Sequence, residues 1–125
     1  MLFIDLDGFK TVNDWLGHAT GDDVLARVAN RILHHTRPGD EVARVGGDEF
    51  LVILRHLGAD ETGEAVASRI EDAVSAPSQV GPDTVRVGAS VGIAQGTPGE
   101  TISDVVARAD RAMYQVKRSR VRLTG

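Results

Sequence analysis

Two adjacent glycines, Gly46 and Gly47, separate two short apolar runs at residues 42–45 and 50–54. A glycine pair between such runs predicts a tight β-hairpin, because glycine accepts the positive φ that tight turns need. A hairpin joins antiparallel strands, so this feature determines how the middle of the chain pairs. Two carboxylates follow the turn directly and are expected at the tip of the hairpin: Asp48 and Glu49.

The rest of the chain alternates apolar runs with amphipathic segments. Hydrophobic periodicity predicts further strands at residues 2–6 and 85–94, and helices at residues 9–16, 20–33, 62–74 and 101–117. Asp7 is expected to cap the first of these helices. Residues 37–40 have the proline and glycine of a type II turn, and residues 76–83 are expected to form a polar loop.

This order of elements predicts one α/β (α+β) domain over residues 1–125. The hairpin requires antiparallel neighbours and the helical crossovers allow parallel ones, so we expect a mixed central sheet flanked by helices. A hydrophobic content of 42% is enough to form a core. The net charge of −4 offers no basic surface to a nucleic acid polymer, and the lack of cysteine excludes disulfides and thiolate metal sites.

Two groups of polar residues are candidates for chemistry. Asp5 and Asp48 converge at one edge of the sheet if their strands are neighbours, and carboxylates with backbone oxygens and water suit Mg²⁺. A turn residue and a solvated hairpin tip are the alternative, and spacing alone leaves both open. Around the next helical turn, Asn13 and Asp22 have the chemistry to read a guanine edge, with His18 beside them. Helix capping and loop hydrogen bonds are the alternative there.

Positive charge is found in two places. Lys10 lies in the first turn of the first helix, where a helix N-terminus and an ammonium together suit a phosphate. The tail, residues 117–122, is the second basic segment. A solvated surface is the alternative for both, since isolated lysines and arginines are mostly exposed.

Five blocks of the sequence together resemble the GGDEF diguanylate cyclase family. They are GGDEF (46–50), FIDLDGFKTVND (3–14), GHATGD (17–22), VGASVGIA (87–94) and ADRAMYQVK (109–117), in the family's order. The resemblance implies a nucleotidyl-cyclase, palm-like fold. It also implies that two GTP molecules become cyclic di-GMP and two pyrophosphates, with one GTP held by each subunit of a homodimer.

The resemblance also implies a role for individual residues. The ligands of Mg²⁺, or of Mn²⁺ in its place, would be Asp5, Asp48 and the carbonyl of Leu6. Lys117 would reach the phosphate tail, and Glu49 would lie at the edge of the site, behind the metal or as the base. The other substrate contacts are implied for Phe9 and Lys10 (phosphates), Asn13, His18 and Asp22 (guanine), and Gly46 and Gly47 (ribose and phosphate).

The turn at residues 37–40 has a second interpretation in this light. The family often carries an R-x-x-D product-inhibition site five residues before its signature, and Arg37 and Asp40 have that spacing. Arg37 would fork a phosphate of cyclic di-GMP or stack on its guanine, and Asp40 would accept from the guanine edge. Arg69 is a candidate for a further contact. A plain turn with charged ends is compatible with the same residues.

The chain departs from the family in two places. The N-terminal helix and D-x-L-T-x-L-x-N-R segment are missing, so we expect a truncated domain of a longer protein, with a sensory or phosphodiesterase domain fused to it. Where the family reads K-x-x-G-R, residues 117–121 read KRSRV. Arg120 and Arg122 are the two candidates to replace the family's arginine.

Three functions fit these observations. The first is an active, product-inhibited cyclase, which the intact carboxylates favour. The second is a catalytically silent module that binds GTP or cyclic di-GMP and regulates a neighbouring domain. The third, an unrelated α/β protein that binds Mg²⁺ and a nucleotide, needs the order of the blocks to be coincidence. A GTP substrate predicts a cytoplasmic domain, with a membrane tether in the longer protein left open.

Overall fold

Four strands form the central sheet, in the order β2-β3-β1-β6, in a computed structural model that describes residues 1–55 and 61–124 and, of residues 121–124, the backbone alone. Their bounds are Leu2–Asp7 (β1), Glu41–Arg44 (β2), Glu49–Ile53 (β3) and Gly88–Ile93 (β6). The α/β fold with helices flanking a sheet is confirmed. Within the described part of the chain every pairing in this sheet is antiparallel, so the crossovers do not produce the parallel neighbours of a mixed sheet.

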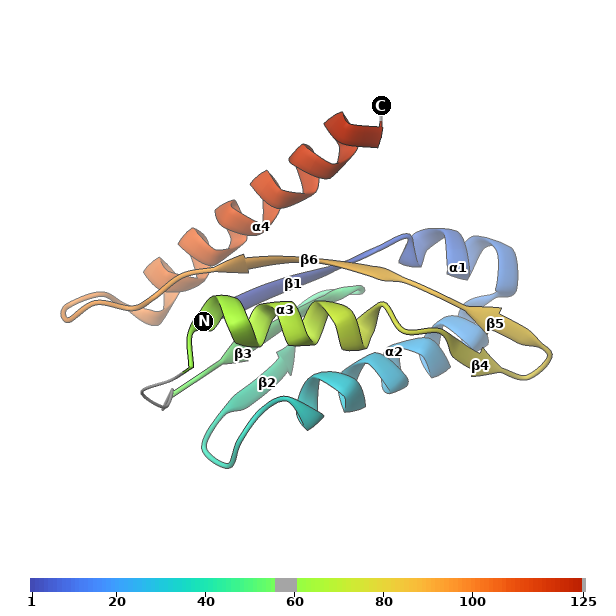
Figure 1. Cartoon of the computed structure of the whole chain (residues 1–125), viewed down its shortest axis with the longest axis horizontal. Coiled ribbons are helices and arrows are strands. Elements are labelled where there is room, and N and C mark those ends of the chain that lie inside the picture. The colour runs from blue at the N-terminus through green and yellow to red at the C-terminus, as the bar shows by residue number, and fades with distance from the viewer. Residues whose placement is uncertain (56–60, 125) are drawn as a thin grey trace.

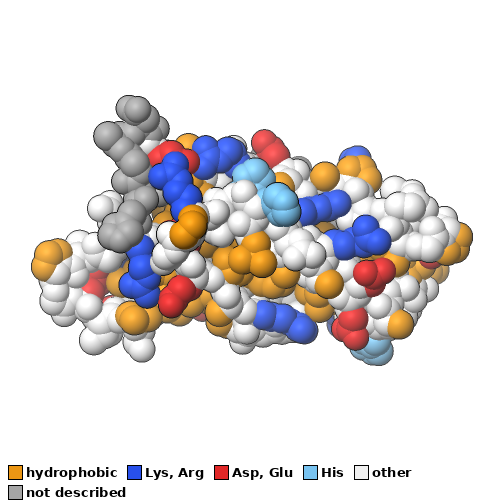
Figure 2. All heavy atoms as spheres, turned by 90° about the horizontal axis from the view of Figure 1, so that it is seen from below, with side chains coloured by type: hydrophobic (Ala, Val, Ile, Leu, Met, Phe, Trp, Pro, Cys, Tyr) orange, Lys and Arg blue, Asp and Glu red, His pale blue; other side chains and the backbone are white. Residues whose placement is uncertain are grey.

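Helices lie on both sides of the sheet (Figure 1). α4 (Ile102–Thr124) crosses one face, and α2 (His18–His34) and α3 (Gly63–Val74) lie together on the other, with α1 (Phe9–Leu16) at one end. Side chains alternate between the faces of a strand, so Ile4 and Leu6 join the larger core on the α2–α3 side and Phe3 joins the smaller one beneath α4. Viewed from the α2 side, hydrophobic side chains show along the middle of the surface between charged ones (Figure 2).

Glycine, not aspartate, precedes α1. Gly8 occupies the N-cap with a φ of 82°, in the left-handed region, and no side chain caps the helix. The prediction that Asp7 caps this helix is wrong, because Asp7 still belongs to β1. The hairpin of β2 and β3 is confirmed, but neither Gly46 nor Gly47 has the positive φ expected of them.

A second hairpin replaces the predicted polar loop. β4 (Ser78–Val80) pairs with β5 (Asp83–Val85), so the strand predicted over residues 85–94 is divided between β5 and β6. The two prolines in this segment favoured the prediction of a loop. Ser78 and Val80 are nevertheless buried on either side of an exposed Gln79, which is the alternation of a strand. Two helices are also longer than predicted: α2 begins at His18, and α4 continues through the basic tail to Thr124. None of the described helices is long and apolar enough to span a membrane.

Gly92 allows α4 to lie close against β6. A Cβ at this position would be 2.1 Å from both the carbonyl oxygen of Ala109 and the amide nitrogen of Met113. These are backbone atoms of α4, so no side-chain rotation relieves the contact. The lack of a side chain at residue 92 therefore determines how deeply α4 docks on the sheet.

Candidate functional site

Neighbouring strands bring Asp5 and Asp48 together, as predicted. β1 pairs with β3 so that Asp5 faces Glu49, and the backbone N–H of Leu6 donates to the carbonyl of Asp48 over 3.0 Å. Burial raises the pKa of Asp48, and the negative charge of Asp5 raises it further. The two carboxylates therefore share one partly desolvated place at the edge of the sheet.

This place fits a hard divalent cation. Asp5 Oδ1 is a buried oxygen without a hydrogen-bond partner, and a cation would satisfy it. The described residues contain no group of three or more His, Cys, Asp or Glu side chains placed to hold a metal. Mg²⁺ needs none, because it is usually bound by one or two carboxylates together with substrate phosphates and water. The donor set here, two carboxylates, suits Mg²⁺.

Glu49 lies beside the same pair. Burial raises its pKa, and the charges of Asp5 and Asp48 raise it further. The turn before it is held by a residue that the sequence did not single out: Arg44 Nε donates to the carbonyls of Gly46 and Gly47 over 3.1 and 3.2 Å. A Cβ at Gly47 would meet nothing within 4 Å, whereas one at Gly46 would be 3.3 Å from the Glu49 carboxyl group, so the turn is open to a ligand at Gly47 and covered by Glu49 at Gly46.

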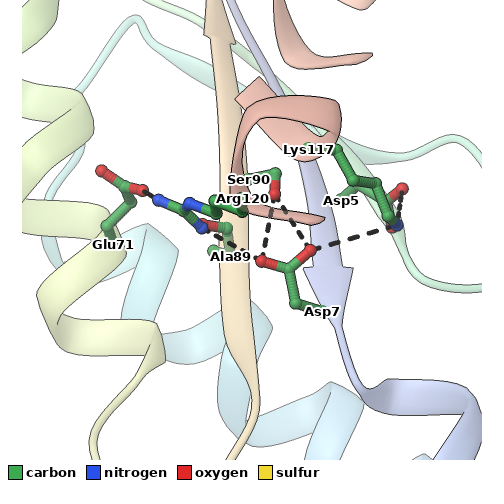
Figure 3. A network of polar contacts seen from close by, with 7 residues as sticks. All are labelled: Asp5, Asp7, Glu71, Ala89, Ser90, Lys117 and Arg120. Carbon is green, nitrogen blue, oxygen red and sulfur yellow. Dashed lines mark hydrogen bonds and ion pairs between the residues drawn. The ribbon is translucent and has the colours of Figure 1, made fainter. Parts of the chain in front are cut away.

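Lys117 reaches the site from α4 (Figure 3). Its Nζ lies 2.7 Å from Asp5 Oδ2 and 4.0 Å from Asp7 Oδ1. Burial lowers the pKa of Lys117, but the hydrogen bond and charge of Asp5 outweigh this, so the net shift is upward. Lys117 is therefore an ammonium that neutralises Asp5 in this structure, and its predicted contact with a phosphate stays a prediction.

Arg120, one turn after Lys117, joins α4 to three other elements (Figure 3). It donates to Asp7 Oδ2 of β1 over 3.0 Å, to the carbonyl of Ala89 in β6, and to Glu71 of α3. Ser90 Oγ in turn donates to both oxygens of Asp7, over 2.9 and 3.0 Å. These contacts do not support Arg120 as the second phosphate contact, and the side chain of Arg122 lies outside the described residues.

Loss of the contacts that Arg120 makes with β1, β6 and α3 is expected to loosen the packing of α4. Arg120→Ala is expected to lower the free energy of unfolding by about 1 kcal/mol, the upper end for partly exposed ion pairs, because one side chain serves several acceptors. Urea denaturation at low and high salt measures this. Arg118→Ala is the matched control, since among the described residues Arg118 contacts only the Tyr114 ring, with its Cζ 5.9 Å from the ring centroid. An equal loss in both variants would contradict a special role for Arg120.

The predicted guanine residues surround the junction of α1 and α2. The half-buried side chain of Asn13 lies against Gly21, where a Cβ would be 1.7 Å from Asn13 Oδ1. His18 and Asp22 are exposed in the first turns of α2, and Asp22 borders a groove of about 480 Å³ between α2 and the β2–β3 hairpin. The Phe9 side chain is buried in the core, so the part of Phe9 left for the predicted phosphate contact is its backbone, at the start of α1. Lys10 is exposed beside it.

The turn after α2 forms a separate hollow. Its backbone closes with a hydrogen bond of 3.0 Å from the N–H of Asp40 to the carbonyl of Arg37, around Gly39 with a φ of 96°. Arg37, Asp40 and Arg69 line one hollow of about 190 Å³. The three residues predicted for product inhibition are thus brought together from two elements.

Comparison with known proteins gives one consistent result. The family described as "Diguanylate cyclase, GGDEF domain" matches residues 1–122. The chain is 42% identical, over 94% of its length, to the bifunctional diguanylate cyclase/cyclic di-GMP phosphodiesterase MucR of Pseudomonas aeruginosa, and equally to the diguanylate cyclase TpbB of that organism. It spans 17% of MucR and 28% of TpbB, so both relatives are much longer.

Solved structures show the same fold. The GGDEF domain of TpbB (YfiN) from P. aeruginosa superposes with a TM-score of 0.86 at 42% identity, covering 94% of this chain and 74% of that one. The GGDEF domain of DgcB from Caulobacter crescentus, solved in complex with c-di-GMP, gives a TM-score of 0.78 at 34% identity, covering 94% and 71%.

Proposed function

Because this chain belongs to the GGDEF diguanylate cyclase family, we propose that it condenses two GTP molecules into cyclic di-GMP, with release of two pyrophosphates. The observation that carries the proposal is the Asp5–Asp48 pair, with its orphaned carboxylate oxygen, next to a glycine turn that lacks side chains. The described residues of one chain form one such pair, so the reaction is proposed to need two chains facing each other.

The residues divide the chemistry between them. The 3′-hydroxyl oxygen of one GTP forms a bond to the α-phosphorus of the other, and the bond from that phosphorus to the pyrophosphate oxygen breaks. Mg²⁺ held by Asp5 and Asp48 would supply the positive charge that polarises the phosphate. Glu49, with its raised pKa, is suited to accept the hydroxyl proton. Lys117 would move from Asp5 to the phosphates.

Guanine recognition is proposed for Asn13 and Asp22, and a buried glycine keeps Asn13 in place. Gly21→Ala is expected to displace the Asn13 amide and raise the KM for GTP about ten-fold, the cost of one lost polar contact. Alanine favours a helix by about 1 kcal/mol over glycine, so stability is not expected to fall. Steady-state kinetics of Gly21→Ala, Asn13→Ala and the double variant measure this. Additive increases in KM would show that Gly21 does not act through Asn13.

Regulation and context are also proposed. Cyclic di-GMP is expected to inhibit the enzyme from the hollow lined by Arg37, Asp40 and Arg69, which supplies guanidinium groups for phosphate and a carboxylate for guanine. The relatives are longer proteins, one of them bifunctional with a phosphodiesterase, so a sensory or phosphodiesterase domain is expected alongside this one. Use of GTP would place the domain in the cytoplasm.

A silent regulatory module is the second candidate. It is favoured by one observation: Lys117 is paired with Asp5, and Arg120 is held by Asp7 and Glu71, so these two basic groups bind acidic groups of the protein itself. Such a module would bind GTP or cyclic di-GMP and pass the signal to a neighbouring domain without turnover.

Incubation with GTP and Mg²⁺, followed by chromatographic separation of the nucleotides, distinguishes the two. One cyclic di-GMP and two pyrophosphates per pair of GTP are expected, and ATP is the matched nucleotide control. The rate is expected to rise more steeply than linearly with protein concentration, because two chains must meet. A folded protein that binds GTP and forms no product over a wide range of protein concentrations would favour the regulatory module.

A further inference from the structure

One carboxylate lies between the two arginines of the predicted inhibitory hollow. Glu61, which also lines the hollow, accepts from Arg69 Nη2 at Oε1 over 2.6 Å and pairs with Arg37 Nη2 at Oε2, also over 2.6 Å. Its side chain is 19% exposed, whereas those of Arg37 and Arg69 are 56% and 45% exposed. Each oxygen of Glu61 is therefore bound to a different guanidinium.

A phosphate of the product would need the same donors. Arginine binds carboxylate and phosphate with the same fork of N–H groups, so a carboxylate already in place competes with an incoming phosphate. We propose that Glu61 is a built-in competitor for Arg37 and Arg69, which weakens the binding of cyclic di-GMP and raises the product concentration at which inhibition begins. This inference rests on the product-inhibition site proposed above.

The turn keeps its shape without Glu61. Asp40 Oδ2 accepts from the N–H of Arg37 over 2.9 Å, and Asp40 Oδ1 accepts from the N–H of Arg55 over 3.0 Å. The turn that presents Arg37 is therefore tied to the end of β3 by backbone donors. Glu61 can leave the arginines while this turn stays formed.

The N-terminus of α3, the helix that carries Arg69, does not need Glu61 for its cap either. Thr62 Oγ1 caps the helix by accepting from the N–H of Ala65 over 3.1 Å. Displacement of the Glu61 carboxylate thus costs two ion pairs between partly exposed groups and leaves the helix cap intact. Ion pairs in which the arginines are this exposed are individually weak, so a phosphate ligand can replace them.

Loss of the Glu61 charge is expected to tighten product binding. Two partly exposed ion pairs no longer have to be broken when the ligand binds, which corresponds to an increase in affinity of about ten-fold. Calorimetric titration of cyclic di-GMP into the parent protein and into Glu61→Gln measures this without turnover. The rate of product formation before product accumulates is expected to stay unchanged, and inhibition by added cyclic di-GMP to begin at about a ten-fold lower concentration.

The matched control is Glu41→Gln, which removes a carboxylate paired with Arg55 over 3.1 Å outside the hollow. Glu41→Gln is expected to bind cyclic di-GMP as the parent does. Glu61→Ala and thermal unfolding of every variant exclude an effect of the glutamine itself or of misfolding.

The outcomes separate the two proposals. If the parent binds cyclic di-GMP and Glu61→Gln binds it no more tightly, the competitor role is wrong while the inhibitory site stands. Weaker binding by both Glu61 variants would mean that Glu61 holds the arginines ready for the ligand. If neither the parent nor the Glu61 variants bind, or if Arg37→Ala in the Glu61→Gln background leaves binding unchanged, the inhibitory site itself is wrong, and the competitor role with it.

Discussion

Asp48→Asn is expected to reduce the formation of cyclic di-GMP by at least about a thousand-fold, while the chain still folds. The substitution removes one of the two carboxylates proposed to hold Mg²⁺, and metal polarisation of a phosphate contributes several kcal/mol to such reactions. Asparagine has nearly the same shape, so the contact between the Leu6 N–H and the Asp48 carbonyl is kept. Chromatography of the nucleotides with GTP and Mg²⁺ measures the loss.

Stability distinguishes loss of the metal site from loss of the fold. The pKa of Asp48 is raised above its ordinary value of 3.8, first by burial and then by the charge of Asp5. The Asp48 carboxyl therefore binds its proton more tightly in the folded state than in the unfolded state. As the pH rises above 3.8 and through the raised pKa, the proton is lost and the free energy of unfolding falls. Asparagine does not ionise, so the Asp48→Asn variant does not lose stability in this way. At neutral pH without metal it is expected to be at least as stable as the parent.

Metal binding gives a second readout. Mg²⁺ is expected to raise the Tm of the parent, since a ligand that binds only the folded state stabilises it. Asp48→Asn is expected to lose most of this shift. A variant that stays active, or that Mg²⁺ stabilises as much as the parent, would contradict the role of Asp48 as a metal ligand.

Gly92→Ala is expected to destabilise the domain by about 3 kcal/mol or more, at the upper end of overpacking, because the new methyl group meets backbone rather than a movable side chain. With Ala109 and Met113 atoms 2.1 Å from the new Cβ, α4 has to move away from β6. Lys117 is on the same helix, so activity is expected to fall as well. Urea denaturation measures the free energy of unfolding.

Gly96→Ala is the matched control. A Cβ at Gly96 would lie 3.5 Å from Val105 Cγ2, which is ordinary van der Waals contact with the same helix. It is expected to change stability by less than about 1 kcal/mol. If Gly92→Ala were as stable as Gly96→Ala, α4 would not be docked as closely as described.

The sequence was most informative where a local pattern decides the structure. Glycines between apolar runs predicted the hairpin, and the spacing of apolar residues predicted the four helices that the structure describes, because both signals are contained within a few residues. The strands β4 and β5 were missed because each is short and flanked by proline. Asp7 looked like a cap because a polar residue before a helix usually is one, but Gly8 supplied the turn instead.

In the candidate site, too, some features could be predicted from the sequence and others could not. Convergence of Asp5 and Asp48 followed from the expectation that their strands are neighbours. The junction around Arg120 could not be predicted, because its partners Asp7, Ala89 and Glu71 come from separate elements that meet only in the folded chain. Glu61 was missed for the same reason, since a lone glutamate before a helix has no pattern that points to two arginines.

The positions of Asp5 and Lys117 along the chain have a consequence for synthesis. These two groups touch in the structure but are 112 residues apart in sequence, and β1 pairs with β6, the last of the described strands in chain order. Contacts between distant segments form slowly and late. A growing chain on the ribosome therefore has Asp5 before the other groups of the site, yet cannot assemble the site until α4 has been translated. A chain whose synthesis stops before α4 would contain Asp5 and Asp48 but lack Lys117, and hence the complete site.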